Sequence, residues 1–328
     1  MKRAGNLIQK ISHFDNLQLA YYKAKKGKEA KLEVIKYAKN LTQNLKILQQ
    51  EIETGNVNVG NYHFFTIYEP KERKIVAASF SERVLHHAIM NICHPYFEKK
   101  LIYDTYATRK NKGTYKALDR AKIFTKKNKY FVKFDIRKYF DSIDHTILNK
   151  MLECLFKDKI LLTIFKKIIN SYPKEKGKGL AIGNLTSQYF ANRYLGDLDH
   201  FIKHTLRIKA YVRYMDDFVI WHNSKDVLIN ASKQIEIFLK QQLNLVLKYK
   251  QLNKSYFGLS FLSYRLFPNK ITLTPKAKKR FKTKIKYNYN KLKTKEWTQE
   301  QFAEHTRALT AFTAYAYSKK FRNCIING

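Results

Sequence analysis

Residues 210–221 read AYVRYMDDFVIW, in which two β-branched and aromatic runs, Ala210–Tyr214 and Phe218–Trp221, flank the short connection Met215-Asp216-Asp217. Two such runs joined by so few residues predict a β-hairpin. Adjacent carboxylates at a hairpin turn repel each other, and a bound divalent cation removes that penalty. Mg²⁺ prefers carboxylate and phosphate oxygens, so the pair suggests a magnesium site. Because lone Asp-Asp pairs are also common in exposed turns, the motif requires a partner elsewhere in the chain.

A second stretch, FVKFDIRKYFDSIDH at residues 131–145, offers that partner. Its aromatic and β-branched run Tyr130–Phe134 predicts a buried strand that ends in a carboxylate, Asp135. If this strand adjoins the hairpin in one sheet, Asp135 lies beside Asp216. Three converging carboxylates could hold two Mg²⁺ ions about 3.5–4 Å apart. Such a pair would activate a primer 3′-hydroxyl and neutralise a triphosphate, which is most of what in-line phosphoryl transfer requires.

The overall charge of the chain points to a polyanionic partner. Lys and Arg total 64 against 26 acidic residues, which gives a formal net charge of +38 over 328 residues. Nucleic acid is the usual counterpart of so basic a protein, and an anionic membrane surface is the alternative. A hydrophobic content of 45% excludes a disordered chain, and the length suits two or three subdomains.

Membrane and secretion signals are missing from the sequence. No apolar run approaches the roughly 18 residues that span a bilayer, and the N-terminal MKRAGNLIQK lacks the apolar segment of a signal peptide. Cys93, Cys154 and Cys324 are widely spaced, which is typical of reduced thiols in a reducing compartment. We therefore expect a cytoplasmic protein with no membrane partner.

The rest of the chain alternates helical and strand-like patterns. Strands embedded among helices indicate an α+β fold, in which a sheet has helices packed on one face. The expected strands cover 63–68 and 75–78, and the expected helices cover 81–97, 146–156 and 187–203, with Leu41, Leu45 and Leu48 at helical spacing upstream.

The segment that follows Pro275 is strongly basic, with ten Lys or Arg residues in the range 276–295. On one helical face of this range lie four apolar residues, Phe281, Ile285, Tyr289 and Leu292. Thr298 and Gln301 match a capping box that begins another helix. We interpret residues from about 270 onward as a basic helical subdomain, with a solvated lysine face that binds nothing as the alternative.

The chain resembles reverse transcriptases over nearly its whole length, with the motifs in the same order. FDIRKYFDSIDH at 134–145 and RYMDDFVIW at 213–221 look like the segments that carry the catalytic aspartates. SFLSYRLFP at 260–268 resembles the primer-gripping hairpin, and PKERKIVAASFSERVLHHAI at 70–89 resembles the nucleotide-binding part of the fingers. The resemblance implies a right-hand polymerase with fingers in 1–125, a palm with an antiparallel sheet in 126–269, and a helical thumb in 270–328.

The resemblance also implies roles for individual residues. Asp135, Asp216 and Asp217 would be catalytic, and together with Ile136 they would hold two Mg²⁺ ions, for which Mn²⁺ could substitute. Arg73 and Lys71 would contact the triphosphate, and Phe140 would exclude a 2′-OH. Nucleic-acid contacts would come from basic residues that could equally be solvated, namely Arg109, Lys112, Lys276, Lys278, Lys279 and Arg280.

One loop resembles a particular group of reverse transcriptases. Most bacterial members read Q-G-x-x-x-S-P there, whereas this chain reads IGNLTSQ at 182–188, the pattern of diversity-generating retroelements. Two further segments also resemble that group, NLIQKISHFDNLQLAYYKAKKGK at 6–28 and DTYATRKNKGTYKAL at 104–118, as does the short length of the chain. The resemblance assigns Ile182, Gly183 and Gln188 to the nucleotide site. Ile182 offers shape but no polar contact, which discriminates weakly between substrates and would permit misincorporation opposite template adenine.

That group implies a set of partners. They are a structured template RNA, a DNA primer and its cDNA product, dNTPs, and a small basic accessory variability protein that forms a ring. Error-prone cDNA of a template repeat would then replace a variable repeat in a target gene. The alternatives are another bacterial reverse transcriptase, of the group II intron, retron or phage-defence type, and a non-catalytic RNA-binding scaffold on a polymerase fold.

Overall fold

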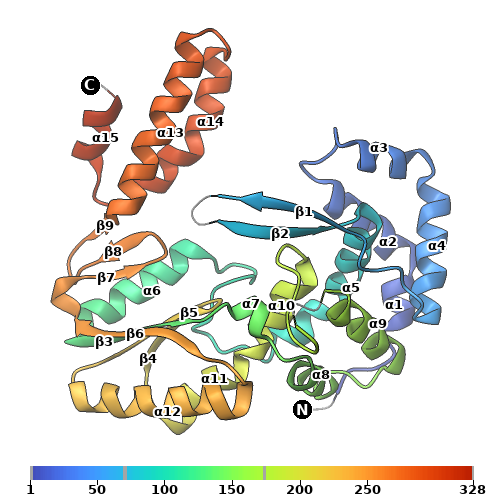
Figure 1. Ribbon diagram of the computed structural model, residues 1–328, viewed down its shortest axis with the longest axis horizontal. Helices are drawn as coiled ribbons and strands as arrows, with labels where there is room; N and C mark the ends of the chain where they lie inside the picture. The colour runs from blue at the N-terminus through green and yellow to red at the C-terminus, as the bar shows by residue number, and fades with distance from the viewer. Residues whose placement is uncertain (1–2, 69–71, 173–174, 327–328) are drawn as a thin grey trace. The chain divides into compact units, whose positions relative to one another are not determined.

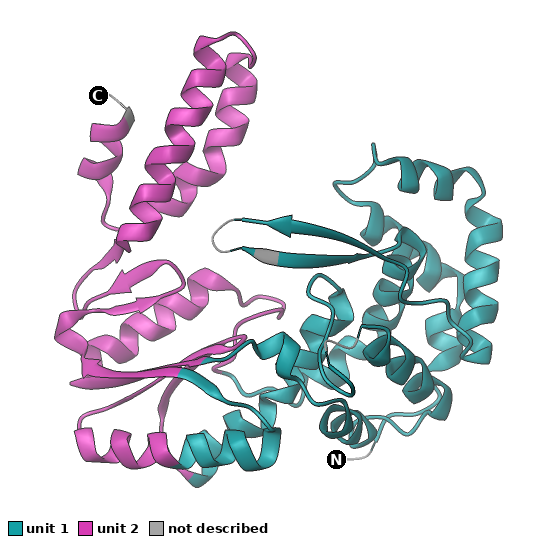
Figure 2. Ribbon diagram, viewed as in Figure 1, with its two compact units in different colours: residues 1–103, 136–205, 234–248 teal, residues 104–135, 206–233, 249–328 magenta. Residues whose placement is uncertain are grey.

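A computed structural model of the chain describes residues 3–68, 72–172 and 175–326 (Figure 1). The chain divides into two compact units, shown in separate colours in Figure 2. Unit 1 comprises residues 1–103, 136–205 and 234–248, and unit 2 comprises 104–135, 206–233 and 249–328. None of the described helices is both long enough and apolar enough to cross a bilayer.

Unit 1 is mainly helical and contains one antiparallel hairpin, β1 (Tyr62–Ile67) with β2 (Arg73–Ala78). Its N-terminal helices are α1 (Ile8–Ser12), α2 (Phe14–Lys25), α3 (Leu32–Lys39), α4 (Leu41–Thr54) and α5 (Phe80–Glu98). Helix α4 ends at Gly55, whose φ of 70° suits a residue without a side chain. These elements confirm the strands and helices expected before residue 100, with bounds that shift by one or two residues.

The second half of unit 1 carries α7 (Tyr139–Ser142), α8 (His145–Glu153), α9 (Lys159–Asn170), α10 (Leu185–Tyr194), α11 (Gly196–His200) and the π-turn Phe201–Thr205. The single helix expected over 187–203 is thus divided into three pieces. The first break occurs at Leu195, directly before Gly196, a residue that weakens a helix interior by about 1 kcal/mol relative to alanine. Helix α12 (Lys225–Leu243) runs from unit 2 into unit 1.

Unit 2 is built on a four-stranded sheet in the order β4-β5-β3-β6. The strands are β3 (Tyr130–Ile136), β4 (Ala210–Tyr214), β5 (Asp217–His222) and β6 (Leu247–Lys254). Strands β4 and β5 form the expected hairpin, and β5 also pairs antiparallel with β3. The predicted α+β class with an antiparallel palm sheet is therefore confirmed.

Both faces of this sheet are buried, which differs from the single covered face that the sequence suggested. On one face Phe131, Val219 and Trp221 pack in a cluster that includes Leu118 of α6 (Thr114–Lys127). On the other face the rings of Phe134 and Phe218 stack at 4.7 Å between centroids. The runs of consecutive apolar residues in β4 and β5 reflect this two-sided burial, since a sheet with one wet face alternates apolar and polar residues.

A small three-stranded sheet and three helices complete unit 2. The strands are β7 (Leu259–Phe261), β8 (Tyr264–Leu266) and β9 (Ile271–Leu273), and the helices are α13 (Pro275–Lys293), α14 (Gln299–Ala314) and α15 (Lys319–Ile326). The capping box at Thr298 and Gln301 forms as predicted. The expected apolar face of α13 is only partly correct. Phe281 and Ile285 are buried, but Tyr289 is exposed, and Asn288 is buried beside it and contacts Thr306.

Candidate active site

Three aspartates meet at one end of the palm sheet, all within unit 2. Asp135 near the end of β3 lies directly opposite Asp217, the first residue of β5, in the antiparallel register. Asp217 also pairs with Tyr214 of β4, so Met215 and Asp216 alone form the turn. The residue opposite Asp135 is thus Asp217, where the sequence had suggested Asp216. Directly opposed residues have Cβ atoms roughly 4.5–5.5 Å apart, which brings these two carboxylates to one spot.

A hydrogen bond from the buried side chain of Arg213 stabilises the hairpin turn that carries Asp216. Met215 adopts a φ of 56°, the left-handed conformation of the first central residue in a type II′ hairpin turn. Arg213 is fully buried, and its Nη1 donates to the main-chain oxygen of Met215 at 3.1 Å. The Arg213 main chain is itself bonded on both sides, to the oxygen of Asp104 and the N–H of Tyr106. This network fixes the turn and therefore the position of Asp216.

A lysine neutralises one of the aspartates. Lys133 lies two residues before Asp135, on the same face of β3, and its Nζ is 3.1 Å from Oδ2 of Asp217. The same ammonium donates to the main-chain oxygen of Ser260 in β7 at 2.9 Å and lies 5.9 Å from the ring centroid of Phe261. The side chains of Lys133 and Asp217 are only 11% and 25% exposed, so the pair is largely screened from water. Lys133 therefore joins the Asp217 carboxylate to the small sheet of unit 2.

The Asp217 carboxyl titrates abnormally. Burial raises its pKa from 3.8 to about 6, against the opposing effect of the Lys133 ammonium. The negative charges of Asp216 and Asp135 raise the pKa further. A carboxyl that is costly to ionise and faces two like charges is an arrangement that proteins often keep for function.

These residues suit a divalent cation. Within the described residues, Oδ1 of Asp217 is buried and has no hydrogen-bond partner, so one oxygen of the site is left to a ligand from outside. In the described part of the chain, no group of three or more His, Cys, Asp or Glu side chains has a geometry that could hold a metal ion. Ile136 has a buried apolar side chain, so only its main-chain oxygen could serve a cation.

The residues assigned to the nucleotide belong to unit 1, where two distant segments come together. Arg73 begins β2, and Lys71 lies outside the described residues. The N–H of Val76 in β2 donates to the main-chain oxygen of Ile182 at 3.0 Å. Gly183 has a φ of 130°, and a Cβ on it would lie 2.6 Å from the oxygen of Val76. The loop at 182–183 therefore packs directly on β2.

Phe140 and Gln188 also lie in unit 1. Phe140 is a half-buried residue of α7 whose main-chain oxygen accepts from the N–H of Leu180, and its ring contacts Tyr139 edge-on. Gln188 lies in the first turn of α10, the helix that follows the 182–183 loop. The segment 180–188 thus connects the residues assigned to nucleotide selection.

The basic residues assigned to nucleic acid make local contacts in unit 2. Arg109 donates to the main-chain oxygen of Thr105 at 2.9 Å, and the Lys112 ammonium lies 4.7 Å from the ring centroid of Tyr106. On α13, Lys278 lies over the ring of Phe321 and Arg280 over that of Phe312. Lys276 and Lys279 are exposed on the same helix. Their roles in binding nucleic acid stay predictions.

Sequence reasoning missed Lys133 and Arg213. The signal was present in both cases, because each is a lone cation inside an apolar strand, FVKFD and YVRYM. A charged residue in a buried strand requires a partner. The partner of Lys133 is the Asp217 carboxylate, and that of Arg213 is the main-chain oxygen of Met215, the residue before Asp216.

Comparisons with known proteins agree with this geometry. The family described as "Reverse transcriptase (RNA-dependent DNA polymerase)" matches residues 69–266. The chain is 21% identical to the group II intron-encoded protein LtrA of Lactococcus lactis subsp. cremoris over 266 residues, 75% of this chain and 44% of that protein. It is 24% identical to a putative COX1/OXI3 intron 1 protein of Saccharomyces cerevisiae over 211 residues, 61% of this chain and 25% of that protein. The chain therefore spans less than half the length of these relatives.

Among solved structures, apo telomerase from Candida tropicalis has a TM-score of 0.55 with 12% sequence identity, over 80% of this chain and 59% of that one. A likeness at this level of identity concerns the fold alone. It agrees with the right-hand polymerase fold expected from the motifs.

Proposed function

Because the chain belongs to the reverse transcriptase family, we propose that it copies RNA into DNA by adding dNMP units to a primer 3′ end. The observation that carries the proposal is the opposition of Asp135 to Asp217 across neighbouring strands, with Asp216 in the adjoining turn. This pairing brings carboxylates from distant segments of the chain to one end of the sheet.

Each residue of the site has a distinct task in this reaction. Asp135, Asp216 and Asp217 would hold Mg²⁺, or Mn²⁺ in its place, which supplies charge for the triphosphate and lowers the pKa of the primer 3′-hydroxyl. Lys133 balances Asp217 and anchors it to Ser260. The hydrogen bond from Arg213 to the Met215 oxygen keeps the turn rigid. The Asp216 carboxylate therefore needs no reorganisation when substrate binds.

In unit 1, the proposed nucleotide pocket contains Arg73, Phe140, Ile182, Gly183 and Gln188. Arg73 would pair with the triphosphate, and the ring of Phe140 would exclude a ribose 2′-OH. The subdomains would follow the bounds 1–125 for the fingers, 126–269 for the palm and 270–328 for the thumb, and the protein would work in the cytoplasm.

Extension of a DNA primer on an RNA template tests this function. The expected product is a DNA strand that lengthens with dNTPs and hardly at all with NTPs, because the Phe140 gate excludes ribose. Failure to extend any primer, with RNA and cellular partners supplied, would contradict the proposal and favour a non-catalytic RNA-binding scaffold.

Within this family we further propose a diversity-generating role, with error-prone cDNA made from a template repeat. The supporting feature is Ile182, whose main chain is fixed to Val76 while its side chain provides no hydrogen bond to the nascent pair. The similarity to group II intron proteins favours the alternative, a reverse transcriptase of intron, retron or phage-defence type. A structured RNA and a small basic ring-forming accessory protein would complete the diversifying assembly, with RNA bridging two basic proteins.

Sequencing of cDNA copied from a template with defined adenines separates these two roles. A diversifying enzyme misincorporates opposite adenine, and an Ile182→Gln substitution, which restores a polar contact, lowers that error rate. Faithful copying by the unaltered protein at template adenines would refute the diversifying role and leave the polymerase proposal intact.

A further inference from the structure

Two adjoining cavities lie in unit 2 at the end of the palm sheet where β3 begins. The first has a volume of about 490 Å³ and lies between the end of α6, the start of β3 and the end of β6. The second, of about 500 Å³, lies beside the β8–β9 connection. Because Tyr256 and Pro268 line both, the cavities form one surface. We call this surface, which comprises residues 125–130, 223, 254–257 and 267–270, the lysine groove.

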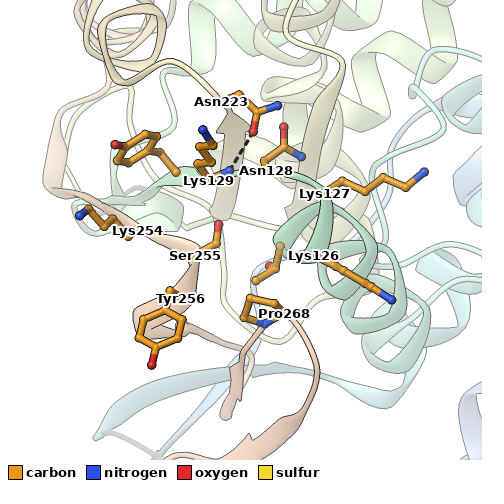
Figure 3. A pocket seen from close by; sticks show the side chains of 11 residues that line it. Lys126, Lys127, Asn128, Lys129, Asn223, Lys254, Ser255, Tyr256 and Pro268 are labelled. Carbon is orange, nitrogen blue, oxygen red and sulfur yellow. Dashed lines mark hydrogen bonds between the residues drawn. The ribbon is translucent and has the colours of Figure 1, made fainter.

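All the charged residues that line the lysine groove are lysines. Figure 3 shows Lys126 and Lys127 at the end of α6 on one side of the first cavity and Lys254 on the other. Lys129 lies between them, and Lys270 lines the second cavity. None of the described residues that line either cavity is acidic, so these charges have no neutralising partner within the lining. A concave surface of this kind concentrates anions.

Main-chain contacts make the floor of the groove rigid. The N–H of Lys129 donates to Oδ1 of Asn223 at 3.0 Å, and the N–H of Ser255 donates to the main-chain oxygen of Lys129 at 2.8 Å. The Ser255 side chain is only 2% exposed, and its hydroxyl has no hydrogen-bond partner among the described residues. A buried hydroxyl without a partner in the lining of a cavity indicates a polar group that is supplied from outside.

Exposed aromatic rings stand at the junction of the two cavities. Tyr256 is 77% exposed and Phe257 is 51% exposed, in a single 3₁₀ turn that ends at Gly258. Gly258 has a φ of 82°, and a Cβ on it would lie 2.7 Å from the ring of Phe267, so only glycine permits this turn. The exposed ring of Tyr256, held on a rigid basic surface, is available for a flat partner to stack on. Rings beside lysines are the usual platform for unpaired bases.

The groove is separate from the aspartates. Tyr130 lines the first cavity and Asp135 lies five residues along the same strand, so about 17 Å separates the two places at 3.3 Å per residue. We propose that the lysine groove binds a single-stranded segment of RNA. A duplex would offer phosphates to the lysines but no free base to Tyr256. The choice of RNA over DNA rests on the proposed function, since a polymerase that copies RNA keeps its DNA product paired and its template unpaired.

Fluorescence anisotropy with a labelled single-stranded RNA of about 12 nucleotides, within the span of known single-strand sites, tests the groove. Tyr256→Ala is expected to weaken binding about 10-fold, as the loss of one stacked base does, whereas Tyr256→Phe keeps the ring and restores binding. Replacement of Lys127 and Lys254 by glutamine is expected to reduce the slope of log affinity against log salt by about 1.4, at roughly 0.7 per phosphate contact. Tyr317→Ala, at an 87% exposed tyrosine outside the groove, is the matched control and leaves binding unchanged.

Three outcomes would overturn the inference. Equal RNA affinity of the unaltered protein and Tyr256→Ala would exclude stacking in the groove. Sensitivity to Tyr256→Ala with a single-stranded DNA of the same sequence, but not with the RNA, would assign the groove to DNA. Capture of an acidic protein through the lysines, with RNA binding unaffected, would assign it to a protein partner. Primer extension on a short template is expected to survive all these substitutions, so a failure of the groove and a failure of the polymerase proposal can be told apart.

Discussion

Substitution of Asp217 by asparagine should stabilise the metal-free protein at neutral pH while abolishing catalysis. The pKa of this carboxyl is about 6 in the folded protein and 3.8 without the fold, a difference of roughly 2 units. At 1.36 kcal/mol per unit, ionised Asp217 lowers the free energy of unfolding by about 3 kcal/mol. The folded protein binds this proton more tightly, so the destabilisation is absent well below pH 3.8, grows as the pH rises from 3.8 to about 6, and is fully present above that.

Urea unfolding with a metal chelator, at about pH 4 and about pH 7.5, measures this effect. Asp217→Asn should gain up to about 3 kcal/mol at the higher pH and less than about 1 kcal/mol at the lower one, because asparagine carries no charge at either. Asp226→Asn, at an exposed aspartate of α12, is the control and should show no such pH dependence. Added Mg²⁺ should stabilise the unaltered protein more than Asp217→Asn. A variant that is no more stable than the unaltered protein at the higher pH would refute the idea that the site is strained without its cation.

Substitutions at three other positions test the remaining parts of the site. Lys133→Met should lower the free energy of unfolding by up to about 3 kcal/mol in chelator, the low end for a broken buried ion pair, while Lys133→Arg should be nearly neutral in the same urea titration. Gly183→Ala should lower both the melting temperature and dNTP affinity, because its Cβ would meet the Val76 oxygen at 2.6 Å; unchanged nucleotide binding would remove the 182–183 loop from the pocket. Phe140→Val should raise the incorporation of ribonucleotides relative to deoxynucleotides in primer extension, and an unaltered ratio would show that another residue excludes the 2′-OH.

Much of the palm could be predicted because its signals are local. The runs that became β3, β4 and β5 combine β-branched and aromatic residues with a two-residue turn, and the capping box at Thr298 is a pattern of four residues. These features depend on neighbours in the chain. The resemblance to reverse transcriptases then added roles that no local pattern supplies.

The contacts that set the chemistry could not be predicted, because they depend on register and on tertiary neighbours. Whether Asp135 faces Asp216 or Asp217 depends on a shift of one residue between β3 and β5. The role of Lys133 depends on β7, which places the main-chain oxygen of Ser260 beside its ammonium group. The sequence around Lys133 does not indicate this contact. The burial of Asn288 in place of Tyr289 likewise follows from how α14 packs on α13.

The most direct test of the central claim is primer extension on RNA as a function of Mg²⁺, with the unaltered protein beside the double variant Asp216→Asn, Asp217→Asn and the Asp226→Asn control. We expect that extension rises with Mg²⁺ in the unaltered protein and the control and is lost in the double variant, which remains folded. Extension that persists in the double variant would contradict the assignment of catalysis to these aspartates.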